Sequence, residues 1–125
     1  MKRLTILAAA YSVLMTALVV WPKQDDPAPA SEVHTGVASW YGETYRGRTT
    51  ASGSVFNPDE LTAAHRSLPF GTVVRCTLGS RSVDVVITDR GPFVEGRELD
   101  LARAAFAKLA HTDAGLINIE WEVIK

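Results

Sequence analysis

Residues 4–21 form a run of eighteen residues without a charged side chain, directly after Lys2 and Arg3. An α-helix of that length spans about 27 Å, close to the roughly 30 Å hydrocarbon core of a bilayer. Because the run has no polar face, it does not suit a helix at the surface of a globular core. Residues 1–21 are therefore predicted to be an export signal, either cleaved or kept as a signal-anchor, with the positive charges on the inner side.

A Pro-rich acidic linker is predicted at residues 22–33, which contain three prolines and three acidic residues. Within it, Ala28-Pro29-Ala30 matches the small-residue pattern of a cleavage site, although it lies well beyond the apolar run. No cysteine ends the apolar run, so the protein is not expected to be a lipoprotein. Either form of the N-terminus would place residues 34–125 in the periplasm or cell envelope, anchored in the inner membrane or soluble.

The remaining composition excludes several classes of protein. Thirteen Lys and Arg against fourteen Asp and Glu, with no basic run, give no electrostatic basis for nucleic-acid binding. The single Cys76 cannot form an internal disulfide, and His34, His65 and His111 lack a metal-ligand spacing. We therefore expect no metal and no cofactor. A domain of about 90 residues without disulfides is marginal in size, which favours a compact, closed architecture.

Three segments alternate apolar and polar side chains, as strands with one buried face do. A fourth, shorter strand ends at Gly42, and Gly79-Ser80 is a tight turn that joins two of the strands into a hairpin. One apolar face includes Cys76, which is predicted to be an unreactive thiol in the core. The expected strands are residues 35–41, 72–78, 82–88 and 116–124.

A helix is expected at about residues 101–110. Leu101, Ala105 and Leu109 recur there at four-residue spacing, and Asp100 is a suitable N-cap. One helix inserted late into an otherwise β-rich chain of this size suggests a small barrel.

Asp89 is the first candidate for chemistry, because it ends a predicted strand just before Gly91-Pro92. Partial desolvation at the rim of a sheet favours the protonated form of a carboxyl, which suits a general acid. The alternative is a structural role, in which Asp89 caps the turn or pairs with Arg90 or Arg97.

His65 is the second candidate. It follows Ala63-Ala64 and precedes a loop that contains Pro69. An isolated histidine of this kind is either an acid, base or ligand, or a hydrogen-bonded structural residue.

Two further segments are candidates for sugar binding. Ser39, Trp40 and Tyr41 precede a turn, where adjacent aromatic rings form either a stacking platform or part of the core. Residues 49–54 are rich in hydroxyl groups, which either bind a sugar or satisfy one another within the loop. The sequence has no Gly-x-Ser-x-Gly motif, phosphate-binding loop or dinucleotide fingerprint.

Taken together, six short motifs resemble the rare lipoprotein A (RlpA) family, and they occur in the family's order over residues 36–125. They are Gly36-Val-Ala-Ser-Trp-Tyr-Gly42, Gly47-Arg-Thr-Thr-Ala-Ser-Gly53, Leu61-Thr-Ala-Ala-His65, Leu68-Pro-Phe-Gly-Thr72, Asp89-Arg-Gly-Pro-Phe93 and Leu99-Asp-Leu101. The resemblance implies a mainly β fold: a six-stranded double-psi β-barrel with one or two short helices, preceded by the N-terminal apolar helix.

The resemblance also implies an activity, that of an endolytic lytic transglycosylase that cleaves peptidoglycan glycan strands, preferably those lacking stem peptides. Asp89 matches the family's catalytic aspartate and His65 its active-site histidine. Ser54 and Asn57 stand where the family usually has Glu and Asp. The implied partner is the glycan strand, with the inner membrane as a second partner if the N-terminus is uncleaved, and the protein is expected to be a monomer. Substrate contacts are expected from Ser39, Trp40, Tyr41, Thr50, Ser52, Ser54, Asn57 and Arg90.

Lytic cleavage tolerates the loss of the two family carboxylates better than hydrolysis does. Inverting hydrolysis needs a second carboxyl to activate water. In lytic cleavage one carboxyl protonates the glycosidic oxygen and then takes the proton of the muramic acid 6-hydroxyl. The alternative function is a non-catalytic, expansin-like module that binds polysaccharide. A third, remote alternative is a structural envelope protein whose barrel binds another protein.

Overall fold

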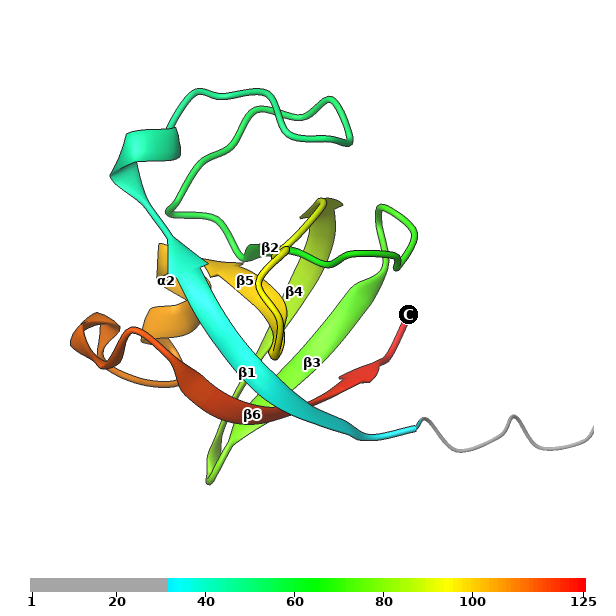
Figure 1. Ribbon diagram of the computed structural model, residues 1–125, viewed down its shortest axis with the longest axis vertical. Helices are drawn as coiled ribbons and strands as arrows, with labels where there is room; N and C mark the ends of the chain where they lie inside the picture. The colour runs from blue at the N-terminus through cyan, green and yellow to red at the C-terminus, as the bar shows by residue number, and fades with distance from the viewer. Residues whose placement is uncertain (1–31) are drawn as a thin grey trace, which may run out of the picture.

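The computed structural model describes residues 32–125 (Figure 1). The predicted export signal and most of the predicted linker lie outside the described residues. Within residues 32–125, no helix is both long and apolar enough to span a membrane. The described strands are β1 (His34–Tyr41), β2 (Thr62–Ala64), β3 (Val73–Leu78), β4 (Arg81–Asp89), β5 (Arg97–Ala102) and β6 (Ile117–Val123).

The six strands close into a barrel in the order β1-β5-β2-β4-β3-β6. β1 pairs with β5 and β2 with β4 in parallel, and the other four pairs are antiparallel. Closure leaves no free sheet edge, which suits a domain of this size. The predicted fold class, a mainly β six-stranded barrel with little helix, is confirmed.

The core is built from strand faces that alternate as the sequence predicted. Val83, Val85 and Ile87 of β4 are buried, whereas the residues between them are exposed. Cys76 is buried as well, and burial raises the pKa of its thiol to about 12. The thiolate is therefore scarce at neutral pH, and the predicted core position of Cys76 is confirmed.

The predicted helix is shorter than expected. α2 (Arg103–Ala107) begins after Ala102, which is its N-cap, so the prediction that Asp100 caps the helix is wrong. Leu101 belongs to β5, where it pairs with Ala63 and Trp40. Leu101, Ala105 and Leu109 recur every four residues because the end of β5 and the helical segment bury side chains in the same core.

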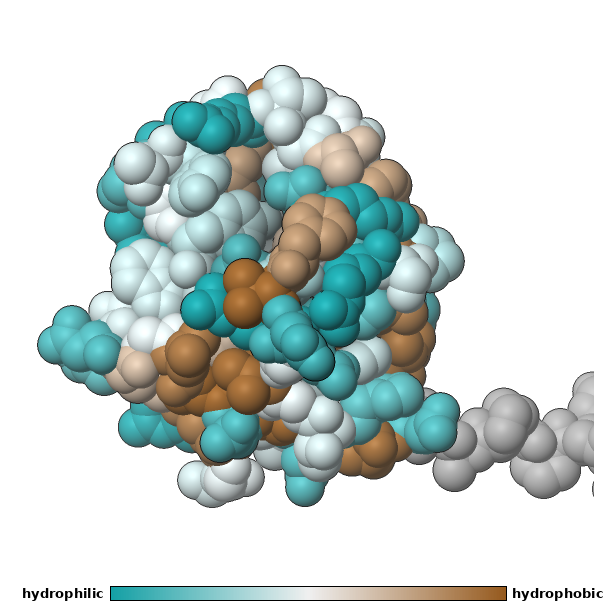
Figure 2. All heavy atoms as spheres, viewed as in Figure 1, coloured by the Kyte–Doolittle hydropathy of each residue, from teal (hydrophilic) through white to brown (hydrophobic). Residues whose placement is uncertain are grey.

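Short helical turns and one long loop complete the fold. η2 (Glu43–Tyr45) opens the long connection from β1 to β2, and η3 (Thr112–Ala114) precedes β6. Figure 1 shows that this connection, residues 42–61, arches over one end of the barrel. Its surface is mostly hydrophilic or neutral, whereas apolar side chains gather lower in the same view, near the start of β6 (Figure 2).

Candidate active site

Two aspartates lie at one level of the barrel, with one strand between them. Ala64, the last residue of β2, pairs with Asp89 of β4 on one side and with Asp100 of β5 on the other. Asp100 in turn pairs with Ser39 of β1. A row across four neighbouring strands therefore brings both aspartates to the same end of the barrel, beneath the long loop.

Asp89 is held by the backbone. Its Oδ1 accepts hydrogen bonds from the amide N–H of Ala51 (3.0 Å) and of Arg90 (2.9 Å). No described residue donates a hydrogen bond to its Oδ2. The two donors fix the carboxyl group in one orientation and leave the second oxygen available to a ligand.

Asp100 is the residue of this site that sequence reasoning missed. Burial raises the pKa of its carboxyl to about 6, and the Asp89 charge acts in the same direction. A 3.2 Å hydrogen bond from Ser39 Oγ to Oδ1 and the charge of Arg97 act in the opposite direction, with a smaller effect. Asp100 is thus a carboxyl group that carries a proton at mildly acidic pH.

Tyr41 completes this cluster. Its ring stacks on Phe56 with the ring centroids 4.2 Å apart and meets Tyr45 edge-on. Its hydroxyl is buried and has no hydrogen-bond partner among the described residues. Burial raises the pKa of the phenol, and the charges of Asp89 and Asp100 raise it further. A protonated phenol therefore lies in the field of both carboxyl groups.

The hydroxyl-rich loop lies next to Asp89. Thr50, Ser52 and Ser54 form a triangle of side-chain hydrogen bonds of 2.8 to 3.0 Å. The amide of Ser52 also donates to the carbonyl of Thr88, beside Asp89 in the chain. These contacts hold the loop so that the Ala51 amide meets Asp89. Ser54, where the sequence resemblance implies a Glu, belongs to this triangle.

The His65 side chain belongs to a neighbouring cluster. Its amide donates to the Asp89 carbonyl, but its ring meets Trp121 edge-on, with the centroids 5.3 Å apart. Its Nδ1 accepts from the amides of Ser67 and Leu68, so the neutral ring carries its proton on Nε2. Burial is the main cause that lowers the His65 pKa, and the neutral form therefore dominates at pH 7.

Trp121 connects His65 to the start of β1. The His34 ring stacks on Trp121 at 4.2 Å, and Trp121 Nε1 donates to Glu98 at 3.0 Å. A side chain at Gly36 would collide with Glu98, because an added Cβ would lie 2.5 Å from its Cγ. Glycine at position 36 thus leaves room for the carboxylate that holds the indole.

The two adjacent aromatic residues of β1 have different neighbours. Trp40 Nε1 donates to the Thr112 carbonyl at 3.0 Å, and its ring packs near Phe106 of α2. Tyr41 lies with Asp89 and Asp100 instead. Successive side chains of a strand point to opposite faces, which separates the two rings.

Arg90 follows Asp89 in the chain, and its amide donates to that carboxyl group. Its guanidinium stacks on the ring of Phe70, 3.9 Å from the centroid, and donates to the His65 carbonyl at 3.2 Å. The stacked pair presents a flat surface, because Phe70 is 41% exposed.

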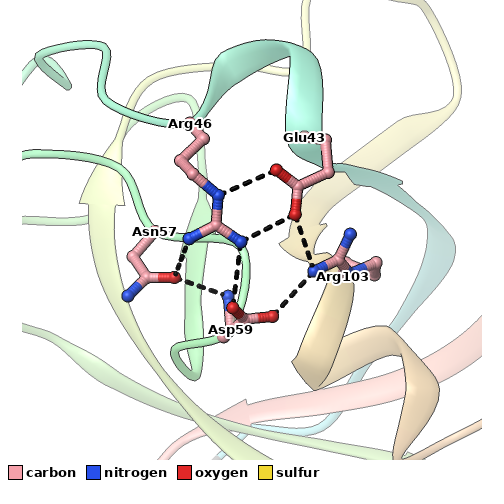
Figure 3. A network of polar contacts seen from close by, with 5 residues as sticks. All are labelled: Glu43, Arg46, Asn57, Asp59 and Arg103. Carbon is pink, nitrogen blue, oxygen red and sulfur yellow. Dashed lines mark hydrogen bonds and ion pairs between the residues drawn. The ribbon is translucent and has the colours of Figure 1, made fainter.

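Asn57 is held in a network of charged side chains at the base of the long loop (Figure 3). Its Oδ1 accepts from Arg46 (3.3 Å) and from the Asp59 amide (2.9 Å). Arg46 also pairs with Glu43 and Asp59, and Arg103 of α2 joins the same two carboxylates. Hydrogen bonds from the two arginines lower the pKa of Asp59. The network ties the loop to α2, and among the described residues no hydrogen bond joins Asn57 to Asp89.

Removal of Arg46 is expected to loosen the loop with little effect on the barrel. The pairs are exposed, so Arg46→Ala should leave the unfolding free energy almost unchanged. Hydrogen exchange at the Ala51 amide should become several-fold faster. Arg75→Ala is the matched control, because Arg75 forms an exposed pair with Asp84 away from the loop. Equal exchange at Ala51 in both variants would contradict the role of the network.

Comparison with known proteins identifies the family. Residues 33–121 match the family described as lytic transglycolase, whose domain is a double-psi β-barrel. The chain belongs to this RlpA-like family. The resemblance inferred from the sequence motifs is thereby confirmed, and the family accounts for the closed barrel described above.

The curated relatives of this RlpA-like chain include proteins named endolytic peptidoglycan transglycosylases. "Endolytic peptidoglycan transglycosylase RlpA" of Yersinia pestis is 44% identical over 98 residues, which are 77% of this chain and 27% of the relative. The protein of the same name from Campylobacter jejuni is 39% identical over 95 residues, 74% of this chain and 34% of the relative. The chain spans about a quarter to two fifths of the length of the curated relatives it matches.

Solved structures share the barrel. Streptomyces papain inhibitor has a TM-score of 0.66 at 25% identity, over 78% of this chain and 98% of the inhibitor. A mutant expansin of Clavibacter michiganensis in complex with cellohexaose has a TM-score of 0.62 at 25% identity, over 75% of this chain and 51% of the expansin. The same fold is thus found in a protease inhibitor and in a protein that binds a glucan chain.

Proposed function

We propose that the protein is an endolytic peptidoglycan lytic transglycosylase that cleaves glycan strands, preferably those without stem peptides, to 1,6-anhydromuramyl ends. The observation that carries this proposal is the carboxyl group of Asp89. It ends β4, is oriented by two backbone N–H groups, and keeps one oxygen without a protein donor. The names of the relatives support the same substrate.

In the proposed reaction Asp89 acts first as acid and then as base. Its proton goes to the glycosidic oxygen as the bond from that oxygen to C1 of the muramic acid breaks. The resulting carboxylate takes the proton of the 6-hydroxyl while O6 forms a bond to C1. No water is consumed, and Asp89 ends the cycle protonated. Ser54 and Asn57 need not replace the carboxylates of the family, because no water has to be activated.

The other candidate residues have supporting roles in this proposal. The hydroxyls of the loop that contacts Asp89 bind sugar hydroxyls, the buried Tyr41 hydroxyl stays inside the site, and the Arg90–Phe70 pair offers a flat face to a sugar ring. His65 positions the segment after β2 through its two amide contacts. We place the barrel in the periplasm or cell envelope, as a monomer that is anchored by residues 1–21 or released by cleavage.

The product assay tests the proposal. Full-length chain is incubated with glycan strands freed of stem peptides, and the products are analysed by mass spectrometry. We expect new ends that carry 1,6-anhydromuramic acid, 18 Da lighter than the hydrolysis product because no water is added. New reducing ends without anhydro ends would contradict lytic cleavage.

The second candidate is a non-catalytic polysaccharide-binding module. The observation that favours it is the likeness to an expansin solved with cellohexaose, at a TM-score of 0.62. Sedimentation of the chain with sacculi, without any new ends after prolonged incubation, would select this function over the first.

A further inference from the structure

Arg90 is a half-buried cation without a carboxylate partner. Arg46, Arg75 and Arg103 are each paired with an acidic side chain, whereas Arg90 forms no ion pair with any of residues 32–125. Burial removes part of the water around a charge, and a charge without a counter-charge is poorly compensated for that loss. The guanidinium is therefore suited to an anion that comes from outside this part of the chain.

The guanidinium is also fixed in one orientation. One flat face lies over the Phe70 ring, 3.9 Å from the centroid. Its Nη1 donates to the carbonyl of His65 at 3.2 Å and lies 3.5 Å from the carbonyl of Asp89. Within the described residues, Nε and Nη2 have no acceptor. These two nitrogens form one edge of the guanidinium, and such an edge binds a carboxylate through two parallel hydrogen bonds.

This edge belongs to a group that contacts the main chain of the proposed acid. The Asp89 carboxyl is oriented by two amides, and its Oδ2 accepts from no described residue. In the proposed reaction the bond that breaks is at C1 of the muramic acid, and the lactyl group is carried by C3 of the same ring. Without a stem peptide, the lactyl group ends in a free carboxylate, whereas a stem peptide converts it into a neutral amide. The substrate thus brings an anion within one sugar ring of the bond that Asp89 protonates.

We propose that Arg90 binds the free lactyl carboxylate of the muramic acid that is cleaved, and so selects glycan strands that lack stem peptides. The inference rests on the proposed glycan-cleaving function. Nε and Nη2 donate to the two carboxylate oxygens, while Phe70 and the His65 carbonyl hold the guanidinium in place. A lactyl amide has one acceptor oxygen and no charge, so it cannot form the charge-assisted pair. Arg90 is in this view a specificity-determining residue.

A matched pair of tetrasaccharides separates the charge of the lactyl group from its bulk. Both alternate N-acetylglucosamine and N-acetylmuramic acid. In one the lactyl carboxyls are free, and in the other they are methylamides, which are neutral and only slightly larger. Calorimetric titration of full-length Asp89→Asn, which cannot deliver a proton from position 89, gives the Kd of each. We expect the carboxylate form to bind about tenfold more tightly, as one hydrogen-bonded charge pair allows. Equal Kd values would overturn the inference.

Substitutions at position 90 show whether Arg90 makes the distinction. When Arg90→Gln is added to Asp89→Asn, the two tetrasaccharides should bind with equal affinity. Arg66→Gln is the matched control, because Arg66 is an exposed cation whose charge also acts on His65 but which has no ring contact among the described residues. It should keep the preference. Arg90→Lys keeps the cation without the two-pronged edge and should lower the preference to about threefold, even if the glutamine variant does not fold. An undiminished preference in either Arg90 variant would overturn the inference.

The binding and product measurements fail separately. A preference for the free carboxylate together with no anhydro ends from the unmodified protein would overturn glycan cleavage and leave a module that binds the lactyl carboxylate. Anhydro ends from the unmodified protein together with equal Kd values would leave the proposed function standing and overturn the role of Arg90.

Discussion

Replacement of Asp89 with asparagine is expected to reduce the release of anhydromuramyl ends by at least about a hundredfold, since loss of a general acid–base group typically costs 10²–10⁴ in rate. The amide oxygen of asparagine can still accept from the Ala51 and Arg90 amides, which donate to Oδ1 in the parent. The barrel should therefore fold as before. What is lost is a group that donates a proton to one oxygen and accepts it from another.

The measurement is the rate at which anhydro ends appear at saturating glycan, with binding to sacculi measured in parallel. Asp84→Asn is the matched control, because Asp84 lies on the same strand but pairs with Arg75 on an exposed face. It should cleave at nearly the parental rate. If Asp89→Asn kept full activity while binding was unchanged, the proton would have to come from another group, and Asp89 would not be the acid.

Local periodicity predicted the strands that have one buried and one exposed face. β1, β3, β4 and β6 were all expected to within two residues at each end, because alternation of side chains is a property of the strand alone. β2 and β5 were not located. β2 has three residues, too few to show a period, and the pattern of β5 runs directly into that of α2.

The site likewise contains one residue that a local pattern predicted and one that it did not. Asp89 was identified because it ends a recognisable strand before Gly91-Pro92. Asp100 was taken for a helix cap, because its neighbours fitted a helical spacing. Only the register of β2 between β4 and β5 places Asp100 at the same level as Asp89, and a register between distant strands leaves no local trace in the sequence.

Asn57, in contrast to Asp100, was a candidate from the sequence. Its family position suggested a place in the substrate site, but the structure holds its side chain with Arg46 and Asp59 (Figure 3). The contact depends on how residues 42–61 fold over the barrel, and a long loop without periodicity gives few constraints of that kind.

Burial of the Asp100 carboxyl costs stability when it is ionised, and Asp100→Asn should reveal that cost. The folded-state pKa of Asp100, about 6, lies above its ordinary value of 3.8. The folded protein thus binds this proton more tightly than the unfolded chain does. The contribution to stability is fully present below pH 3.8 and is lost as pH rises through 6.

At about 1.4 kcal/mol for each pKa unit, the ionised carboxyl costs at most about 3 kcal/mol at neutral pH. Asparagine keeps the acceptor for Ser39 and has no charge to bury. We therefore expect Asp100→Asn to raise the unfolding free energy by roughly 1–3 kcal/mol at pH 7.5 and to change it little at pH 4. Urea denaturation at the two pH values measures both differences.

Asp84→Asn again provides the control, because the pKa of Asp84 is shifted in the opposite direction to that of Asp100. A hydrogen bond and the charge of Arg75 lower the pKa of Asp84, so its ionised form is the favoured one in the folded protein. That variant should gain nothing at pH 7.5. If Asp100→Asn were instead less stable than the parent at pH 7.5, the ionised Asp100 would be a stabilising group, and its burial would carry no cost of the kind argued above.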